Sequence, residues 1–553
     1  MKLLIEQLDY EINTISHLLP AKYFTYKNDQ KVSIDYVGYY NNFETNETVI
    51  ILPKIFLDET TKTIFGSIPV NDFVNENALE ILKNHQKSKT DIDFIYRFAL
   101  VFYLSLREFQ QRNADTDITE STSTKNIISN IETTVLSELD LIFSLLRFYQ
   151  ENKDLIIFKQ KESEKQHFKK TDWVKTVRRQ TPIFQNNIPI YTKNNQSQPT
   201  QNNDNELLII FFSVLKHFEL QYGFNISLEN ITIQKISQDF ERKSLRTLKS
   251  IKQQYFSDKF KKLLFLLIAY FEKKSVGSGK ESNKEEFILC KNYNIVFEDM
   301  IDKLLSDKGK IIDKMKYQQD GKILDHIFEH HSFFEPDSIF YIGDSKYYKE
   351  STQYSKNSIY KQHTYAKNVI QYNINLFNEA KPLNNVRYRD ELTEGYNITP
   401  NFFIQGFIDH QNLANSMADF QFDTTQKPKI NYHFENRIFD RDTLFVYNFR
   451  INFVFVLQSY LEKNQEYLAD FSDKSKKTIR EQVWEHLYQE YDFFYLKPTT
   501  NLKDFVTANF KILNGKIYAN SQTKDSLILG LKKNFQESTE IKNMFGILLT
   551  KLQ

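Results

Sequence analysis

The stretch SIFYIGDSKYY, Ser338–Tyr348, constrains the fold of this chain more than any other segment. If it is extended, Phe340 and Ile342 point to one side of the strand. Ile339 and Tyr341 point to the other side, so the strand is apolar on both faces. Such a strand must be covered on both faces, which is typical of a central strand in an α/β sheet. The stretch therefore predicts a layered α/β fold.

The segments around this strand predict a fixed order of elements. Residues 294–309, NIVFEDMIDKLLSDKG, repeat apolar positions at helical spacing, and Gly309 is the expected helix stop. Residues 322–331 form another apolar stretch, joined to the central strand by a polar turn that contains proline. Residues 357–377 again predict a helix. The expected order is helix, strand, strand, helix.

Two charged residues near the end of the central strand indicate a catalytic site. Asp344 and Lys346 are two residues apart, so the pleat of a strand directs both side chains to the same face. A divalent cation such as Mg²⁺ needs hard oxygen ligands, and a neighbouring lysine can orient water or stabilise charge on a phosphate. This pair therefore predicts a metal-dependent phosphodiesterase site.

A second carboxylate must reach the same cation, and the strand geometry decides between two candidates. Asp337 lies seven residues before Asp344, and at about 3.3 Å per residue an extended strand separates them by roughly 23 Å. An antiparallel hairpin instead brings Asp325 alongside Asp344, at a separation of roughly 5 Å. We therefore choose Asp325 and expect Asp337 to be a turn residue that bonds nearby backbone.

The two flanking helices offer further polar groups. Glu298 lies at the edge of the apolar face of the first helix. Gln362 and Tyr365 are three residues apart on the second helix and so face the same way. Each alone is most often a surface residue, but the order Glu, Asp, Asp-x-Lys, Gln makes chance the poorer explanation.

This order resembles the PD-(D/E)xK nuclease superfamily, and more narrowly the LlaJI-type restriction endonucleases, which are similar to McrC subunits. The resemblance covers most of residues 35–460. Its motifs are FEDM (297–300), LDHIF (324–328), IGDSKYY (342–348) and IYKQHTY (359–365), with VGYY (37–40), ILPKIF (51–56), DWVKTV (172–177) and NNIPIY (186–191) in the N-terminal half.

The resemblance implies a core in which a mixed sheet is flanked by helices. It implies cleavage of double-stranded DNA with Mg²⁺, or Mn²⁺ in its place, by a subunit that works beside a McrB-like AAA+ GTPase; a homodimer on DNA is a further candidate assembly. The expected metal ligands are Asp325, Asp344 and Glu298. Lys346 is expected to stabilise the transition state or activate water, and Gln362 to align the site.

The chain has 553 residues, enough for about three or four domains. We expect an N-terminal α+β region at 1–160, with a hairpin at 37–56 and a candidate partner or DNA contact. A basic connecting segment and linker at 161–205 follows, because residues 192–205 contain no apolar residue to bury. We place the nuclease domain at 206–400 and a C-terminal α/β region at 401–553.

Composition restricts the remaining possibilities. The single cysteine, Cys290, excludes an intramolecular disulfide and a zinc site of several thiolates. The longest apolar runs are far shorter than the roughly 20 residues that a bilayer requires. We expect a soluble, cytoplasmic bacterial protein with no membrane partner. Lys plus Arg (72) balance Asp plus Glu (71), so only local basic clusters can indicate DNA binding.

Two basic runs are candidate DNA contacts, although a solvated surface is the more frequent meaning of such runs. They contain Lys169, Lys170, Arg178 and Arg179 in the first, and Arg242, Lys243, Arg246 and Lys249 at helical spacing in the second. Trp173, beside the first run, is expected to be a core residue.

Two other functions were considered, a zinc site and a subunit that binds DNA without cutting it. His330 and His331 lack HExxH spacing and are expected to be turn residues rather than zinc ligands. The chain can also be a DNA-binding or motor-regulating subunit that keeps a nuclease-like fold without cutting.

Overall fold

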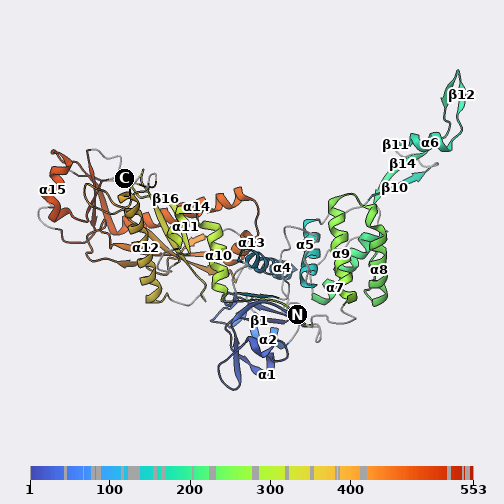
Figure 1. Cartoon of the computed structure of the whole chain (residues 1–553), viewed down its shortest axis with the longest axis horizontal. Coiled ribbons are helices and arrows are strands. Elements are labelled where there is room, and N and C mark those ends of the chain that lie inside the picture. The colour runs from blue at the N-terminus through green and yellow to red at the C-terminus, as the bar shows by residue number, and fades with distance from the viewer. Residues whose placement is uncertain are drawn as a thin grey trace.

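The computed structural model describes residues 2–42, 47–65, 68–75, 81, 89–113, 118–121, 138–152, 158–163, 170–201, 205–222, 232–276, 285–317, 323–334, 336–348, 354–379, 381, 383, 386–410, 420–519, 525–537, 541 and 549–551. Over these residues the protein is a mixed α/β structure with several sheets and helices between them (Figure 1). The expected α/β class is confirmed.

The N-terminal part of the chain contributes most of a five-stranded sheet with strand order β1-β6-β5-β15-β9. Its strands are β1 (Lys2–Ile5), β6 (Glu47–Leu52), β5 (Tyr36–Asn42), β15 (Glu285–Lys291) and β9 (Thr119–Ser121). β5 and β6 pair antiparallel, which confirms the predicted hairpin. β15 pairs with β5 through buried apolar residues, so this strand from the expected nuclease segment completes the N-terminal sheet.

Shorter elements surround this sheet. They are β2 (Tyr10–Glu11), α1 (Ile12–Ile15), β3 (Phe24–Tyr26), β4 (Lys31–Ile34), β7 (Thr63–Ile64), β8 (Ile68–Pro69) and α2 (Val70–Asn75). β2, β4 and β3 form a separate three-stranded sheet.

A helical bundle lies to one side of the N-terminal sheet (Figure 1). Its helices are α5 (Glu138–Glu151), α7 (Glu206–Tyr222), α8 (Gln238–Ile251) and α9 (Asp258–Val276), and α4 (Lys89–Arg112) lies between the bundle and the rest of the chain. None of the described helices is long and apolar enough to cross a lipid bilayer.

A slender arm extends from the bundle (Figure 1). It contains β10 (Phe158–Ser163), β11 (Lys170–Thr171), α6 (Trp173–Arg179), the hairpin of β12 (Ile183–Gln185) and β13 (Ile188–Ile190), and β14 (Gln196–Gln201). β14 pairs with both β10 and β11, so part of the expected linker is a strand. Backbone pairing orders this segment although its sequence offers nothing to bury.

The strand that contains Asp344 belongs to a six-stranded mixed sheet. Its strands are β16 (His326–His331), β17 (Ser338–Lys346), β18 (Pro400–Phe407), β21 (Leu444–Asn452), β19 (Phe420–Phe422) and β20 (Lys429–Asn431). β16 is antiparallel to β17, whereas β17, β18 and β21 are parallel. This sheet therefore continues beyond residue 400, where we expected the nuclease domain to end.

Helices flank this sheet in the predicted order. α10 (Tyr293–Leu305) and α11 (Lys310–Lys316) precede β16, and α12 (Lys356–Asn378) follows β17. α10 ends at Leu305 because Ser306 is extended, and Gly309 caps the start of α11 instead of ending α10. The expected helix, strand, strand, helix order is confirmed, with this one correction at the helix end.

The remainder of the chain packs beside the same sheet. α13 (Phe453–Tyr460) and α14 (Gln465–Glu490) lead to a four-stranded sheet of β23 (Ile517–Tyr518), β24 (Leu527–Lys532), β22 (Tyr491–Leu496) and β25 (Leu549–Lys551). α15 (Leu502–Leu513) lies with it at the far end of the molecule (Figure 1).

The N-terminal sheet meets the site sheet at Tyr347, the residue after Lys346. The buried Tyr347 hydroxyl donates a hydrogen bond to the Glu6 carboxylate and accepts one of 3.0 Å from the backbone N–H of Lys54. The Lys54 ammonium lies 4.7 Å from the centroid of the Tyr347 ring. Burial raises the pKa of Glu6, while the charge of Lys54 opposes that rise. A buried polar contact thus holds the two sheets together.

Gly343 is required by close packing within the site sheet. A Cβ atom at Gly343 would lie 2.3 Å from Cε2 of Phe402. Phe402 is fully buried on the neighbouring strand, so its ring has little room to move.

We expect Gly343→Ala to lower the free energy of unfolding by about 1–3 kcal/mol, the usual cost of overpacking a core. Denaturant unfolding measures the free energy of unfolding. Adding Phe402→Leu to Gly343→Ala should restore part of the lost stability. An unchanged free energy of unfolding for Gly343→Ala would contradict the prediction.

Candidate active site

The antiparallel register of β16 and β17 places Asp325 beside Asp344. His326 pairs with Gly343, and the same register continued by one residue sets Asp325 opposite Asp344. The backbone N–H of Ser345 donates to Oδ2 of Asp325 over 3.2 Å. The hairpin predicted from sequence is therefore confirmed, and it brings the two chosen carboxylates together.

Lys346 joins these carboxylates from the same strand. Its ammonium forms an ion pair with Oδ2 of Asp344, as expected for two side chains on one face of a strand. The ammonium also lies 5.2 Å from the centroid of the Phe403 ring, on the adjacent strand β18. The lysine is thus held between a carboxylate and an aromatic face, with its charge directed at the site.

The charges at this site act strongly on one another. Burial raises the pKa of Asp325 well above its ordinary value, and the neighbouring charge of Asp344 raises it further. Glu298 of α10 is half-buried, and its pKa is raised first by burial and then by Asp344. Lys346 opposes both rises. Three carboxylates and one lysine leave an excess of negative charge, which a divalent cation with oxygen ligands would neutralise.

The cation therefore fits the residues present. Asp325 and Asp344 are in direct contact and supply carboxylate oxygens, whereas Glu298 acts on them from the edge of the site. A described partner of Glu298 is Asn294, whose side-chain amide lies 3.4 Å away. The ligand atoms of Asp325, Asp344 and Glu298 do not all lie within 4.8 Å of one another, so the two aspartates are the ligand pair that the described residues bring together, and Glu298 acts on them only through its charge.

Gln362 is held against the central strand. Its Nε2 donates to the carbonyl oxygen of Ile342 over 2.9 Å, and its side chain is fully buried. Its Oε1 has no hydrogen-bond partner within the described part of the chain. Gln362 therefore fixes the backbone of β17 two residues before Asp344 and keeps one acceptor unused.

Sequence reasoning missed Lys361, which precedes Gln362 in α12. Burial alone would lower the pKa of Lys361, but the hydrogen bond with Tyr365 and the charges of Asp344 and Asp325 raise it. Lys361 is exposed on α12, and its charge acts on both carboxylates from there. Its position in the motif IYKQHTY was the available signal, but helical spacing alone did not show this effect.

Other predicted residues lie away from the carboxylate pair. Asp337 is buried and accepts a hydrogen bond of 2.9 Å from the hydroxyl of Tyr518, which is distant in sequence. His330 and His331 are the last residues of β16 rather than turn residues, and His331 is exposed. The hairpin extends further than the polar sequence of its turn suggested.

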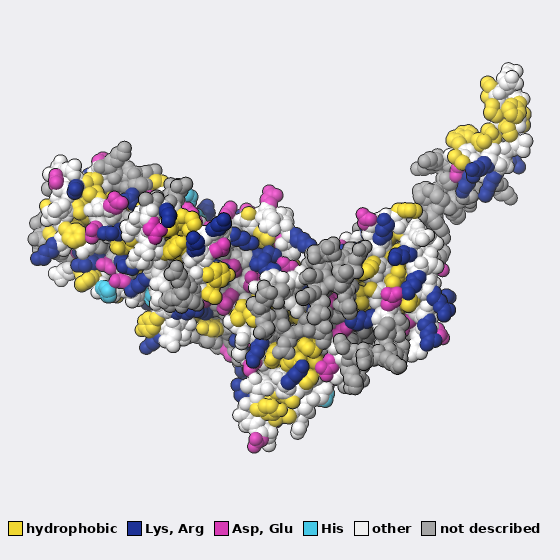
Figure 2. Space-filling view, viewed as in Figure 1, with side chains coloured by type: hydrophobic (Ala, Val, Ile, Leu, Met, Phe, Trp, Pro, Cys, Tyr) yellow, Lys and Arg dark blue, Asp and Glu magenta, His cyan; other side chains and the backbone are white. Residues whose placement is uncertain are grey.

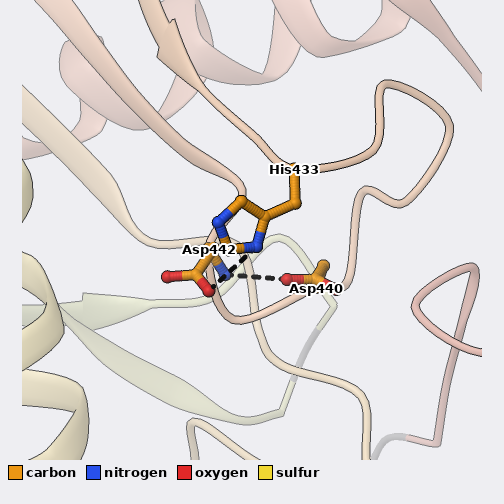
Figure 3. A group of neighbouring side chains, drawn as sticks. All are labelled: His433, Asp440 and Asp442. Carbon is orange, nitrogen blue, oxygen red and sulfur yellow. Dashed lines mark hydrogen bonds and ion pairs between the residues drawn. The ribbon is translucent and has the colours of Figure 1, made fainter.

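A second group of ligand-type side chains lies between β20 and β21 (Figure 3). The ligand atoms of His433, Asp440 and Asp442 lie within 4.8 Å of one another. Asp442 already pairs with Lys367 and lies 3.4 Å from His433, while Asp440 accepts a 2.9 Å bond from the backbone N–H of Asp442. These contacts brace a surface loop, and we assign no metal to it.

The basic residues predicted to contact DNA lie on the bundle and the arm, away from the carboxylate pair (Figures 1 and 2). Those on α8, namely Arg242, Lys243, Arg246 and Lys249, are all exposed, and Lys249 pairs with Glu272. Arg178 and Arg179 are exposed on α6. Lys169 and the side chain of Lys170 lie outside the described residues. Trp173 was expected in the core but is 59% exposed.

The family model of the LlaJI restriction endonuclease matches residues 82–431. The chain belongs to the LlaJI restriction endonuclease family. The match contains both β16 and β17 and therefore the whole carboxylate site. It begins after the motifs VGYY and ILPKIF, which we assigned to the same likeness.

No curated protein matches this LlaJI-family chain. Among solved structures, it is similar to a chain of a half-complex of Thermococcus gammatolerans McrB AAA+ hexamers with bound McrC. The two chains share 10% sequence identity over 86% of this chain and 99% of the other, with a TM-score of 0.28. A similarity at that TM-score carries no argument about this protein.

The raised pKa of Asp325 gives a prediction for the metal-free LlaJI-family chain. At pH 7.5 in EDTA, Asp325→Asn should raise the free energy of unfolding, because it removes a buried negative charge beside Asp344. A raised pKa in the folded state means that wild type takes up this proton first as the pH falls, so the difference should shrink towards pH 4. Denaturant unfolding across this pH range checks the sign. A variant less stable than wild type at every pH would contradict it.

Proposed function

We propose that this chain is a restriction endonuclease subunit that hydrolyses phosphodiester bonds of double-stranded DNA with Mg²⁺, or with Mn²⁺ in its place. The meeting of Asp325, Asp344 and Lys346 at the end of the central strand carries the proposal. Membership of the LlaJI family supports endonuclease activity. The mixed sheet between α10 and α12 supports a PD-(D/E)xK core.

The side chains have separate roles in this proposal. Asp325 and Asp344 would hold the cation, and Glu298 would support it from the rim. The bound cation supplies Lewis acidity and lowers the pKa of water. Lys346 would stabilise negative charge that develops on the scissile phosphate, since a preorganised ammonium needs no reorganisation during the reaction. Gln362 would align the site by fixing the backbone of β17.

Plasmid cleavage tests these roles. Supercoiled plasmid is incubated with the full chain and Mg²⁺, with and without a candidate AAA+ GTPase. Lys346→Ala should slow nicking and linearisation by about 10²–10³-fold, the loss expected on removing one charge-stabilising group. Asp325→Asn and Asp344→Asn should abolish cleavage, because each removes a ligand charge.

Asp337→Asn is the matched control for the two ligand variants. It makes the same chemical change at a buried aspartate whose described partner is Tyr518, so cleavage should persist. If wild type and Lys346→Ala behave alike under every condition, the chain is instead a non-cleaving DNA-binding or motor-regulating subunit.

We also propose that the chain works with a McrB-like AAA+ GTPase in the bacterial cytoplasm. The sequence contains no GxxxxGK[ST] motif, which agrees with a separate motor subunit. One carboxylate site cuts one strand, and a homodimer on DNA would supply the second site. The exposed basic ridge of α8 and the basic run that includes the exposed Arg178 and Arg179 of α6 remain the candidate contacts with DNA phosphates.

The arm is the candidate contact with the partner subunit. Large apolar side chains on α6 and the β12–β13 hairpin are exposed to solvent, namely Trp173, Val174, Val177, Ile183, Phe184, Ile188 and Ile190. They gather on the arm in Figure 2. A helix cap orders this segment, since Asp172 accepts a 3.1 Å bond from the N–H of Lys175. An ordered, exposed apolar surface is typical of a protein–protein contact.

Substitution at the arm tests this contact. Trp173→Ala combined with Phe184→Ala should weaken binding of the AAA+ subunit at least about tenfold, because large aromatic side chains dominate interface energies. Leu220→Ala, at an apolar residue that is 74% exposed on α7, is the control and should bind normally. Binding is measured by titration calorimetry. Equal affinities for wild type and the double variant would exclude the arm.

A further inference from the structure

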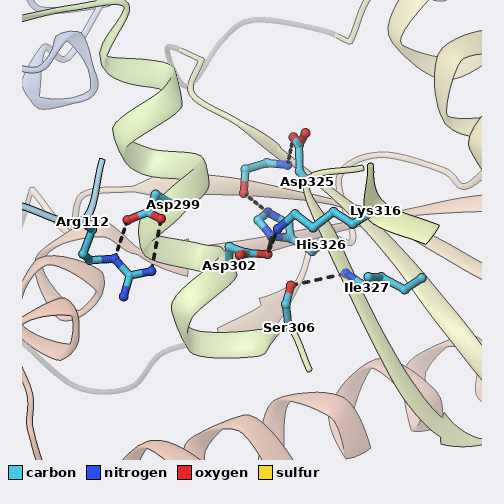
Figure 4. Close-up of polar contacts among 9 residues, drawn as sticks. Arg112, Asp299, Asp302, Ser306, Lys316, Asp325, His326 and Ile327 are labelled. Carbon is cyan, nitrogen blue, oxygen red and sulfur yellow. Dashed lines mark hydrogen bonds and ion pairs between the residues drawn. The ribbon is translucent and has the colours of Figure 1, made fainter. Parts of the chain in front are cut away.

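A buried polar network lies behind the carboxylate site (Figure 4). Side chains alternate along a strand, so His326 and Ser345 face away from Asp325 and Asp344. They face α10, where Asp302 lies one turn after Glu298 and therefore on the same side of the helix. On this side of α10 the charge of Glu298 acts on Asp344, and Asp302 faces His326.

The contacts of this network form a continuous series. Lys316 of α11 pairs with Oδ1 of Asp302 over 2.5 Å, and the same oxygen faces Nδ1 of His326 at 3.6 Å. Nε2 of His326 lies 2.5 Å from the hydroxyl oxygen of Ser345. At 3.6 Å the contact with Asp302 is electrostatic, and Nδ1 of His326 has no hydrogen-bond partner within the described residues. The hydrogen bond of His326 in this network is the one between Nε2 and the Ser345 hydroxyl. His326 is fully buried, whereas Asp302 and Lys316 are partly exposed.

Ser345 connects this network to the site. Its side chain is held by His326 on one face of the sheet, and its backbone N–H donates to Oδ2 of Asp325 over 3.2 Å. It also lies between Asp344 and Lys346 in sequence. A displacement of Ser345 would therefore move Oδ2 of Asp325, to which its N–H donates, and also its sequence neighbours Asp344 and Lys346.

We propose that His326 and Ser345 are positioning residues that hold the Asp325 carboxylate in the geometry needed to bind a divalent cation. This inference rests on the proposed function of the same site. Groups that orient metal-binding carboxylates through hydrogen bonds commonly change metal affinity by about 10–100-fold when removed. Neither residue touches substrate in this proposal, because both act through Asp325.

A purely structural role makes a different prediction. If His326 and Ser345 only satisfy buried polar groups, their loss would lower the stability of the fold and leave cation affinity unchanged. Cation affinity in the absence of DNA therefore distinguishes the two roles.

Three substitutions separate the contacts. Ser345→Ala removes only the hydroxyl. His326→Gln can place an amide group near the position of Nε2 and so retain the contact with Ser345. In His326→Asn the side chain is shorter. Its amide can contact Asp302 but does not reach the hydroxyl of Ser345.

The measurement is Mn²⁺ binding to the full chain, followed by electron paramagnetic resonance of the free ion. Ser345→Ala and His326→Asn should raise the dissociation constant about tenfold or more, whereas His326→Gln should remain within about threefold of wild type. Ser306→Ala is the matched control, because the Ser306 hydroxyl accepts a 3.3 Å bond from the N–H of Ile327 on the same strand without touching Asp325. It should bind Mn²⁺ as wild type does.

The outcomes separate this inference from the function on which it rests. Thermal unfolding first establishes that each variant is folded. If a His326 variant is unfolded, Ser345→Ala alone decides between the positioning role and the purely structural role. Wild-type affinity for Mn²⁺ in folded Ser345→Ala overturns the inference. If Asp325→Asn and Asp344→Asn also bind Mn²⁺ as wild type does, the metal site itself is wrong.

Discussion

The pairing of β16 with β17 is the interaction on which the candidate site depends. A register shift of one residue would turn Asp325 to the opposite face of the sheet and separate it from Asp344. The apolar residues of β16 oppose such a shift, because the buried Ile327 and Phe328 would also exchange faces. Core packing therefore fixes the position of a charged pair that would repel if left alone.

The cost of that pair explains the polar groups gathered around it. Two carboxylates in contact and partly removed from water are unfavourable without compensation. Lys346 and Lys361 supply positive charge from the strand and the helix, and the N–H of Ser345 supplies a hydrogen bond. These groups reduce the excess negative charge without removing it. The remaining repulsion between the carboxylates destabilises the site, and a bound cation would relieve this repulsion.

The site also depends on the N-terminal sheet, although none of its proposed ligands comes from that sheet. Tyr347 follows the site lysine and is held by Glu6 and Lys54. β15 then links the same sheet to α10, which carries Glu298. The N-terminal sheet is therefore part of the support of the site, in addition to any contact that it makes with a partner.

The sequence by itself determined the order of elements around the site and the choice of Asp325 over Asp337. Both follow from local periods, two residues for a strand and 3.6 for a helix, and from the length of an extended strand. The end of α10, the strand within the expected linker and the exposure of Trp173 were not predicted, because each depends on contacts or pairing outside its own segment.

Only the tertiary structure decided which distant groups support the site. Glu6 and Tyr347 are 341 residues apart in sequence, and no periodicity connects them. The same holds for Asp302, His326 and Ser345, which come from one helix and two strands. Residue spacing specifies the face on which a side chain lies, whereas the packing of whole elements specifies what it meets there.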